Sequence, residues 1–258
     1  MQLWDAYMGL AKDMVLERHG SALALQVYLL GTVDFEALLR CQRRLHYEIA
    51  GDRTQAALIL CEHPPLITMG RHSSRAHILA EPAELQLRGW PVRWVNRAGG
   101  CWLHQPGQLA AYALLPLDTL GLDVAAYHCR LGEIVQAWLG DFHIHSERRA
   151  GGIWVGTRLL AGLGCAIRDW VSYFGLCLNI NPVLDPYRLV RCAPKSPEPM
   201  TSLERERRGR ISPSLARERF IEHFQQGFGF GRVSLFTEHL SLTGSMERSA
   251  PPRVPSNR

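Results

Sequence analysis

Lysine is almost missing from this sequence: Lys12 and Lys195 are the only two among 29 basic residues in a chain of 258. Also missing is any apolar run near the roughly 20 residues that a membrane-spanning helix needs. The N-terminal segment does not place basic residues before an apolar stretch, as a secretory signal does. We therefore expect a cytoplasmic protein that does not associate with membranes.

Cysteine is present, but not in the patterns that build disulfides or metal sites. The seven cysteines are odd in number, none form a Cys-x-x-Cys pair, and most lie in apolar surroundings. Neither a disulfide framework nor a structural zinc site is indicated. His63, next to Glu62, has no second histidine at helical spacing, so we read it as a structural strand end. We expect no metal and no cofactor.

The charge balance points to a protein partner as readily as to nucleic acid. The net charge of +5 is mild, and the sequence carries no recognisable nucleic-acid motif. We expect no nucleic-acid binding. With 47% hydrophobic and 21% charged residues the composition is that of a globular protein, so a wholly disordered or fibrous chain is excluded.

Hydrophobic periodicity predicts a single α+β domain with a mixed, largely antiparallel sheet and packed helices. The first helix begins near Asp34 as its cap and ends before Gly51. We assign residues 23–237 to this domain, 1–22 to an N-terminal extension and 238–258 to a disordered tail. Further helices are expected at 124–142 and 212–228, and strands at 22–30, 56–64, 91–96, 109–117 and, as hairpins, within 151–180.

A glycine-rich segment from Arg97 to Gln108 is one candidate site. Its sequence, RAGGCWLHQPGQ, lets the backbone approach a ligand and offers N–H groups to an oxygen anion, with His104 nearby. It matches neither the phosphate-binding P-loop nor the Rossmann dinucleotide pattern. The alternative is a long hairpin turn with a solvated histidine.

Cys192 is a second candidate, because it lies in a polar, proline-punctuated loop. The cationic neighbours Arg191 and Lys195 are of the kind that lowers a thiol pKa. The other six cysteines have the surroundings of small core residues. Cys192 is therefore either a nucleophile or an incidental surface thiol.

Four segments, in this order, resemble the motifs of the lipoyl(octanoyl) transferases, and together they cover roughly residues 24–230. The segment EHPPLITMGR matches E-H-P-P-x-x-T-x-G-R, and RAGGCWLHQPGQ matches R-G-G-x-V-T-Y-H-G-P-G-Q. The third, GLGCAIRDWVSYFGLCLNI, matches the x-I-G and H-G-x-A-L-N-V strands, and LVRCAPKSPEPMTSL matches the P-C-G loop with its T-S-L. The resemblance implies the biotin/lipoyl protein ligase fold.

The resemblance also implies a ping-pong acyl transfer. A cysteine thiolate takes an octanoyl group from acyl carrier protein, and the lysine of a lipoyl domain resolves the acyl-enzyme. The acceptors would be lipoyl domains of 2-oxoacid dehydrogenases or the glycine cleavage H protein. Cys192 matches the nucleophile, with Lys195 or Arg191 as cationic helpers. The family's acyl-binding positions correspond to Arg97, Ala98, Gly99, Gly100, Cys101, Trp102, Leu103 and His104, to Gly162, Leu163 and Gly164, and to Gly175, Leu176 and Cys177.

Some positions depart from the family pattern. The lysine that lowers the nucleophile's pKa in the family corresponds to Leu159, and the histidine before the strand glycine corresponds to Phe174. Arg158 replaces that lysine only if a bulge shifts the strand register. We therefore predict a divergent octanoyltransferase. The alternatives are a catalytically impaired acyl-carrier-binding homologue and an ATP-dependent lipoate or biotin ligase.

Overall fold

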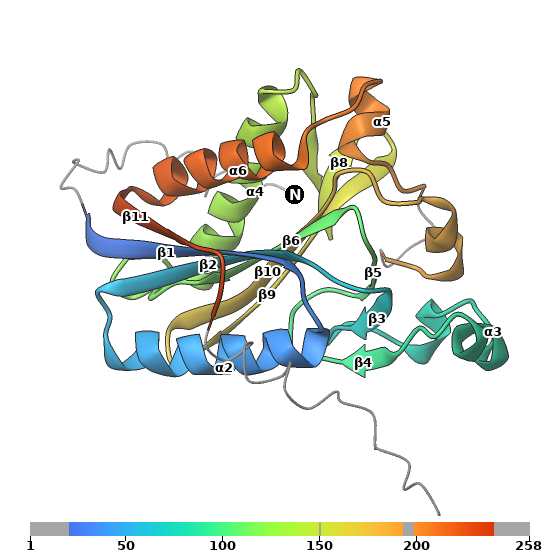
Figure 1. Cartoon of the computed structure of the whole chain (residues 1–258), viewed down its shortest axis with the longest axis horizontal. Helices are drawn as coiled ribbons and strands as arrows, with labels where there is room; N and C mark the ends of the chain where they lie inside the picture. Colours follow the sequence, from blue (N-terminus) through green and yellow to red (C-terminus); the bar gives the residue numbers. More distant parts are fainter. Residues whose placement is uncertain (1–20, 150, 193–198, 240–258) are drawn as a thin grey trace, which may run out of the picture.

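A computed structural model describes residues 21–149, 151–192 and 199–239 of the chain. In it, an eight-stranded sheet lies between helices, and a small three-stranded sheet lies to one side (Figure 1). Most of the predicted N-terminal extension, most of the predicted tail, and Lys195 lie outside the described residues.

The large sheet is mixed, as the sequence predicts. Strand β1 runs parallel to both of its neighbours, and every other neighbouring pair is antiparallel. The predicted α+β class with a largely antiparallel sheet is therefore confirmed. In spatial order the strands are β11 (Phe230–Phe236), β1 (Ser21–Thr32), β2 (Gln55–Glu62), β6 (Gln108–Leu114), β10 (Val171–Asn179), β9 (Arg158–Arg168), β8 (Gly152–Val155) and β7 (Glu147–Arg149).

The small sheet has the order β4 (Val92–Trp94), β3 (Leu66–Met69) and β5 (Cys101–His104). Two prolines that follow β2 separate it from β3, because proline cannot donate to a central ladder. The sequence placed the end of one strand there but did not identify the second strand. On β5, the edge that does not face β3 pairs with no other described strand, and we call it the open edge of β5.

The three long helices form where periodicity predicts them, as α2 (Phe35–Gly51), α4 (Val124–Gly140) and α6 (Pro213–Phe228). Asp34 caps α2 by accepting from the N–H of Ala37 at 2.9 Å. Gly51 is the last residue of α2, so the helix extends one residue further than expected. Shorter helices are α3 (Pro82–Leu87) and α5 (Leu203–Arg207), with 3₁₀ turns η1 (Arg75–His77) and η2 (Asp185–Leu189).

Two hydrophobic cores follow from the alternation of side chains along the strands. In β2, Leu58 and Leu60 face the core beneath α4 and α6, whereas Ile59 faces the core shared with α2 and the small sheet. Figure 1 shows α4 and α6 on one side of the large sheet and α2 on the other. The second core therefore has the small sheet as part of its wall, and the candidate site is there.

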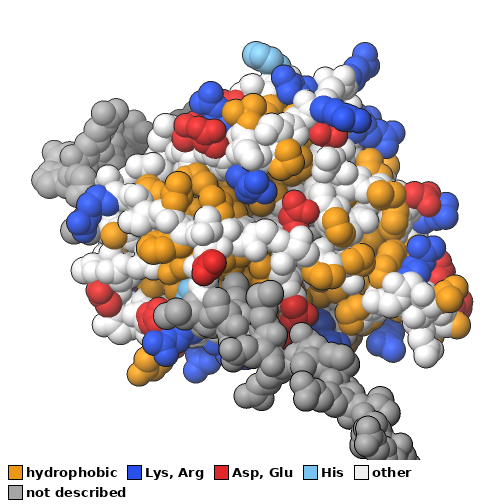
Figure 2. Space-filling view, viewed as in Figure 1, with side chains coloured by type: hydrophobic (Ala, Val, Ile, Leu, Met, Phe, Trp, Pro, Cys, Tyr) orange, Lys and Arg blue, Asp and Glu red, His pale blue; other side chains and the backbone are white. Residues whose placement is uncertain are grey.

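No helix in the described ranges is both long and apolar enough to cross a membrane. On the face shown in Figure 2, arginine side chains are interspersed with acidic ones. The net positive charge is thus not gathered into a single field on that face.

Candidate active site

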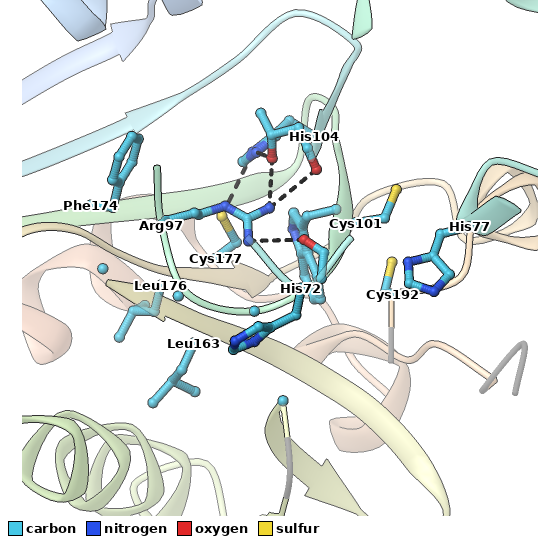
Figure 3. A pocket seen from close by; sticks show the side chains of 18 of the residues that line it. His72, His77, Arg97, Cys101, His104, Leu163, Phe174, Leu176, Cys177 and Cys192 are labelled. Atoms are coloured by element: carbon cyan, nitrogen blue, oxygen red, sulfur yellow. Dashed lines mark hydrogen bonds between the residues drawn. The ribbon is translucent and has the colours of Figure 1, made fainter. Parts of the chain in front are cut away.

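A cavity of about 240 Å³ lies between β9 and β10 of the large sheet and the loop that leads into β5 (Figure 3). Most of the predicted substrate-binding residues line it, and so does Cys192. The side chains of Ala98 and Leu103 do not, and Lys195 lies outside the described residues. The predicted residues that line the cavity are Arg97, Gly99, Gly100, Cys101, Trp102, His104, Gly162, Leu163, Gly164, Gly175, Leu176 and Cys177.

In the glycine-rich loop, the carbonyl oxygens of residues 97–100 accept hydrogen bonds, whereas two N–H groups have no partner within the described ranges. The N–H of Ala98 donates to the Cys165 carbonyl at 2.8 Å, which ties the loop to β9. Gly99 has a φ of +84°, a conformation that favours glycine. Among the described residues, no hydrogen bond uses the N–H groups of Gly99 or Gly100. Two donors of this kind side by side suit an oxygen atom of a ligand.

Arg97 brings a fixed positive charge to the cavity. Its guanidinium donates to the carbonyls of Ala98 and Gly100, both at 3.0 Å, and to the carbonyl and hydroxyl of Thr68 at 3.2 and 2.8 Å. Burial lowers the pKa of Arg97 from its usual 12.5, yet guanidinium stays protonated at physiological pH. These contacts hold the side chain in one position.

A chain of hydrogen bonds continues from Arg97 through Thr68 to His104. The Thr68 hydroxyl lies 3.0 Å from His104 Nε2, and Cys177 Sγ lies 3.6 Å from Nδ1. Burial, together with the neighbouring His63 and Arg97, lowers the pKa of His104 well below 6.5. His104 is therefore a neutral imidazole in this site.

His63 has a structural role, as the sequence predicts. Its Nδ1 donates to the Val33 carbonyl at 2.6 Å, so Nε2 accepts from the Tyr112 hydroxyl at 2.8 Å. Burial lowers the pKa of His63 to about 4, which keeps this neutral form. The pair fixes Tyr112, whose ring lines the cavity.

Small residues on β9 make room for the cavity wall. A Cβ on Gly162 would lie 2.5 Å from the Trp102 ring, and one on Gly164 would lie 2.7 Å from the Ala98 carbonyl. Both contacts are too close for any side chain. Glycine at these positions lets β9 pack directly against the loop and against Trp102.

The segment that carries Cys192 is held by the segment of η1. The N–H of Leu79 donates to the Leu189 carbonyl, and the N–H of Arg191 donates to the His77 carbonyl, both at 2.8 Å. The side chain of Cys192 therefore enters the cavity at a defined place, beside His77 (Figure 3).

The thiol environment differs from the sequence expectation. Burial raises the pKa of Cys192 above its ordinary 9.0, and the nearby Cys101 raises it further. The N–H of Leu103, on the open edge of β5, and the charge of Arg97 act in the opposite direction but are outweighed. The expectation of a lowered pKa counted cations near in sequence and not the desolvation of the sulfur.

Leu159 is fully buried, and no cation replaces the family's lysine from the neighbouring position. A bulge does occur, since Ile153 pairs with Ala161 and Trp154 with Leu159. Arg158 nevertheless pairs with Glu206 through two hydrogen bonds of 2.8 and 2.7 Å and does not line the cavity.

Several lining residues were not identified from the sequence as site residues. These are Phe35, Thr68, His72, His77, Tyr112, Gly151 and Phe174. For His72 and His77, the only signal in the sequence is their place in a polar loop. Of the six cysteines read as core residues, five are buried and Cys129 is half-buried. In the described parts of the chain, no group of three or more His, Cys, Asp or Glu side chains could hold a metal ion.

Comparison with known proteins identifies the family. The model of the lipoyl protein ligase A/B catalytic domain matches residues 34–225. An octanoyltransferase of Syntrophobacter fumaroxidans is 38% identical over 179 residues, which cover 68% of this chain and 78% of that one. One of Chloroflexus aggregans is 38% identical over 184 residues, covering 69% and 83%. The chain belongs to the octanoyltransferase family.

Solved structures show that this octanoyltransferase family member has the lipoate-protein ligase fold. A lipoate-protein ligase A bound with ATP has a TM-score of 0.71 at 15% identity, covering 85% of this chain and 91% of that one. A bipartite lipoate protein ligase from Thermoplasma acidophilum has a TM-score of 0.70 at 14% identity, covering 86% and 90%. At such identities the likeness concerns the fold alone.

Proposed function

We propose that this chain transfers an octanoyl group from acyl carrier protein to the lysine of lipoyl domains, with Cys192 as the covalent carrier. The acceptors are lipoyl domains of 2-oxoacid dehydrogenases or the glycine cleavage H protein. The observation that carries the proposal is that Cys192 enters an apolar cavity that Gly99 and Gly100 also line, and the N–H groups of these glycines have no partner in the part of the chain that the structure describes. A thioester needs these elements: a nucleophile, donors for its oxygen and a dry channel for its chain.

In the first step the Cys192 thiolate attacks the carbonyl carbon of the octanoyl thioester. A bond forms between Sγ and that carbon, the bond from the carbon to the carrier's sulfur breaks, and the carrier thiolate takes up the proton that Cys192 released. We assign the N–H groups of Gly99 and Gly100, two residues that line the same cavity, as the donors to the carbonyl oxygen as it gains charge. Gly100 is also close to Cys192, because a Cβ there would lie 3.4 Å from the Cys192 carbonyl oxygen.

In the second step the ε-amine of the acceptor lysine attacks the same carbon. The new C–N bond makes the amide, the bond from the carbon to Sγ breaks, and the proton lost by the amine returns to Cys192. Because both steps pass through one acyl-enzyme, carrier and acceptor can use the same entrance in turn. Arg191 is exposed at that entrance and suits the acidic surface of a carrier protein. Lys195 remains a proposed helper.

Arg97 takes over part of the task of the absent lysine. It is the positive group within the described residues that favours the thiolate of Cys192. Its four hydrogen bonds keep the charge in place, so it contributes without any rearrangement. His104, which contacts the Thr68 hydroxyl, is neutral, so it lines the site as a hydrogen-bonding group and adds no second charge.

One observation favours a second candidate, an acyl-carrier-binding protein with impaired catalysis. Leu159 stands where the family has its lysine, and burial keeps Cys192 protonated. Such a protein would bind octanoyl-acyl carrier protein tightly and release no product at pH 7 or at pH 9. The experiment that follows separates the two.

Intact-protein mass spectrometry after mixing with octanoyl-acyl carrier protein tests the proposal. We expect an added octanoyl group on Cys192, which disappears when an apo lipoyl domain is supplied. Cys192→Ala should abolish the adduct, whereas Cys129→Ala, at the other half-buried cysteine, should leave it unchanged. Transfer by Cys192→Ala would refute the assignment. Modification of the lipoyl domain only with free octanoate and ATP would identify a ligase instead.

A further inference from the structure

A second hollow lies behind the cavity of the candidate active site. It is a surface groove of about 520 Å³ between α2, β4 and the turn that joins β9 to β10. Its walls include apolar and aromatic side chains such as Leu39, Trp94 and Tyr173. Among the described residues, Phe174 is the one that lines both the groove and the cavity. A single side chain therefore belongs to the wall between them.

The Phe174 ring is held rigidly in this wall. It is 5% exposed and packs against Tyr112 and Tyr173, with ring centroids 6.3 and 5.3 Å apart. Its backbone has a φ of +57°, a strained conformation for an aromatic residue. The N–H of Phe174 donates to the buried Gln42 side chain of α2 at 2.8 Å. That bond keeps the strained backbone in place.

Phe174 lies at the far end of the cavity from the nucleophile. In Figure 3, Cys192 and Phe174 are on opposite sides of the labelled residues, and Leu163 and Leu176 lie on the same side of the view as Phe174, below it. An acyl chain attached to Cys192 and directed toward Phe174 would lie in the cavity that these two leucines help to line. Its terminal methyl group would then meet the Phe174 ring.

We propose that Phe174 sets the upper limit of acyl-chain length by closing the cavity against the groove behind it. The inference rests on the proposed acyl-enzyme at Cys192. Replacing the ring by a methyl group would join the two hollows into one channel. A chain of 12 carbons would then pass through the gap and lie against the apolar wall of the groove.

Single methylene groups are discriminated by about tenfold or more in an apolar pocket of fixed length. We therefore expect Phe174→Ala to raise the ratio of dodecanoyl to octanoyl adduct on Cys192 by about tenfold or more. The substitution keeps a Cβ at the same φ, so it adds no backbone strain. Phe174→Leu, which keeps part of the wall, should give a smaller increase.

The test is a competition between octanoyl- and dodecanoyl-acyl carrier protein, read by intact-protein mass spectrometry. Trp94→Ala is the matched control, because Trp94 lines only the groove and is 58% exposed. It should leave the ratio unchanged. Circular dichroism and thermal unfolding establish that each variant is folded. An unchanged ratio in folded Phe174→Ala and Phe174→Leu would overturn the inference.

Failure of the inference and failure of the proposed function give different results. If the wild-type protein forms no adduct on Cys192 with either carrier, the acyl-enzyme proposal fails. If the wild-type protein forms the octanoyl adduct and the Phe174 variants keep its chain-length ratio, only the role of Phe174 is refuted. Equal octanoyl and dodecanoyl adducts in the wild-type protein would likewise contradict a closed end at Phe174.

Discussion

Replacing Leu159 by lysine restores the charged group that the family has at this position, and it should activate Cys192. Burial holds the pKa of Cys192 above 9.0 in the unmodified protein. At pH 7 the thiolate is therefore less than about one part in a hundred of the thiol. An ammonium within about 4–6 Å of a group that becomes negative shifts its pKa by about 1–3 units. The thiolate fraction, and alkylation that depends on it, should rise at least about tenfold at pH 7.

The same substitution has a cost in stability. Leu159 is completely buried, so a lysine there loses its hydration and regains only part of the loss by pairing with the thiolate. We expect a decrease in unfolding free energy of a few kcal/mol, on the order measured for a buried charge. Leu159→Met is the matched control, because methionine is flexible and apolar and adds no charge. It should change neither the alkylation rate nor the pH at which the rate increases.

The assay is alkylation by iodoacetamide between pH 6 and pH 10, with the Cys192 peptide quantified by mass spectrometry. For the wild-type protein, the rate of Cys192 alkylation should keep rising through pH 9. For Leu159→Lys the rise should begin at lower pH. The reasoning is refuted if Leu159→Lys is folded and its profile matches that of Leu159→Met, because position 159 would then not face the thiol.

Three further predictions test other parts of the site. The pKa of His63 is about 4 in the folded protein and 6.5 in the unfolded chain, so its contribution to stability is complete above pH 6.5 and is lost as the pH falls to 4. Urea unfolding should show the free energy of unfolding decrease by about 3 kcal/mol over this pH range. His63→Gln should reduce this pH dependence. Gly162→Val should force the Trp102 ring aside, reduce the free energy of unfolding by about 1–3 kcal/mol and abolish the Cys192 adduct. Gly140→Ala is the control: a Cβ there meets no atom within 4 Å, so both stability and the adduct should be unchanged. Arg158→Leu should leave the pH profile of Cys192 alkylation unchanged, because Arg158 pairs with Glu206 outside the cavity; an altered profile would mean that it acts on the thiol.

Much of the fold could be predicted from the sequence because its signals are local. Asp34 caps a helix through a bond to an N–H three residues away, and that spacing is visible in the sequence. The prolines after β2 mark its end for a similarly local reason. The division of LITM into a separate small sheet was not predictable, because it depends on pairing with strands more than 20 residues later along the chain.

Site residues that belong to sequence motifs could be predicted, whereas those that reach the site only through packing of the fold could not. Twelve of the fourteen predicted substrate-binding residues line the cavity. Phe174 and Tyr112 were not identified as site residues, since an aromatic residue in a strand is more often core than ligand wall. The pKa of Cys192 was misjudged in direction. Sequence shows which charges are near along the chain, whereas desolvation depends on residues such as Cys101 that fold against the sulfur.

The site as a whole is a neutral chamber with one fixed charge. Burial keeps His104 and His63 uncharged and keeps the thiols of Cys177 and Cys192 protonated. Among the described lining residues, Arg97 brings a buried guanidinium into the chamber, whereas Arg191 is exposed at its entrance. The donors of Arg97 are already used by backbone carbonyls and Thr68. Such a chamber stabilises an uncharged acyl-enzyme and a buried alkyl chain better than a free thiolate. In the proposed reaction, forming the thiolate is therefore the costly part of acyl uptake, and uptake should become faster as the pH rises toward the raised pKa of Cys192.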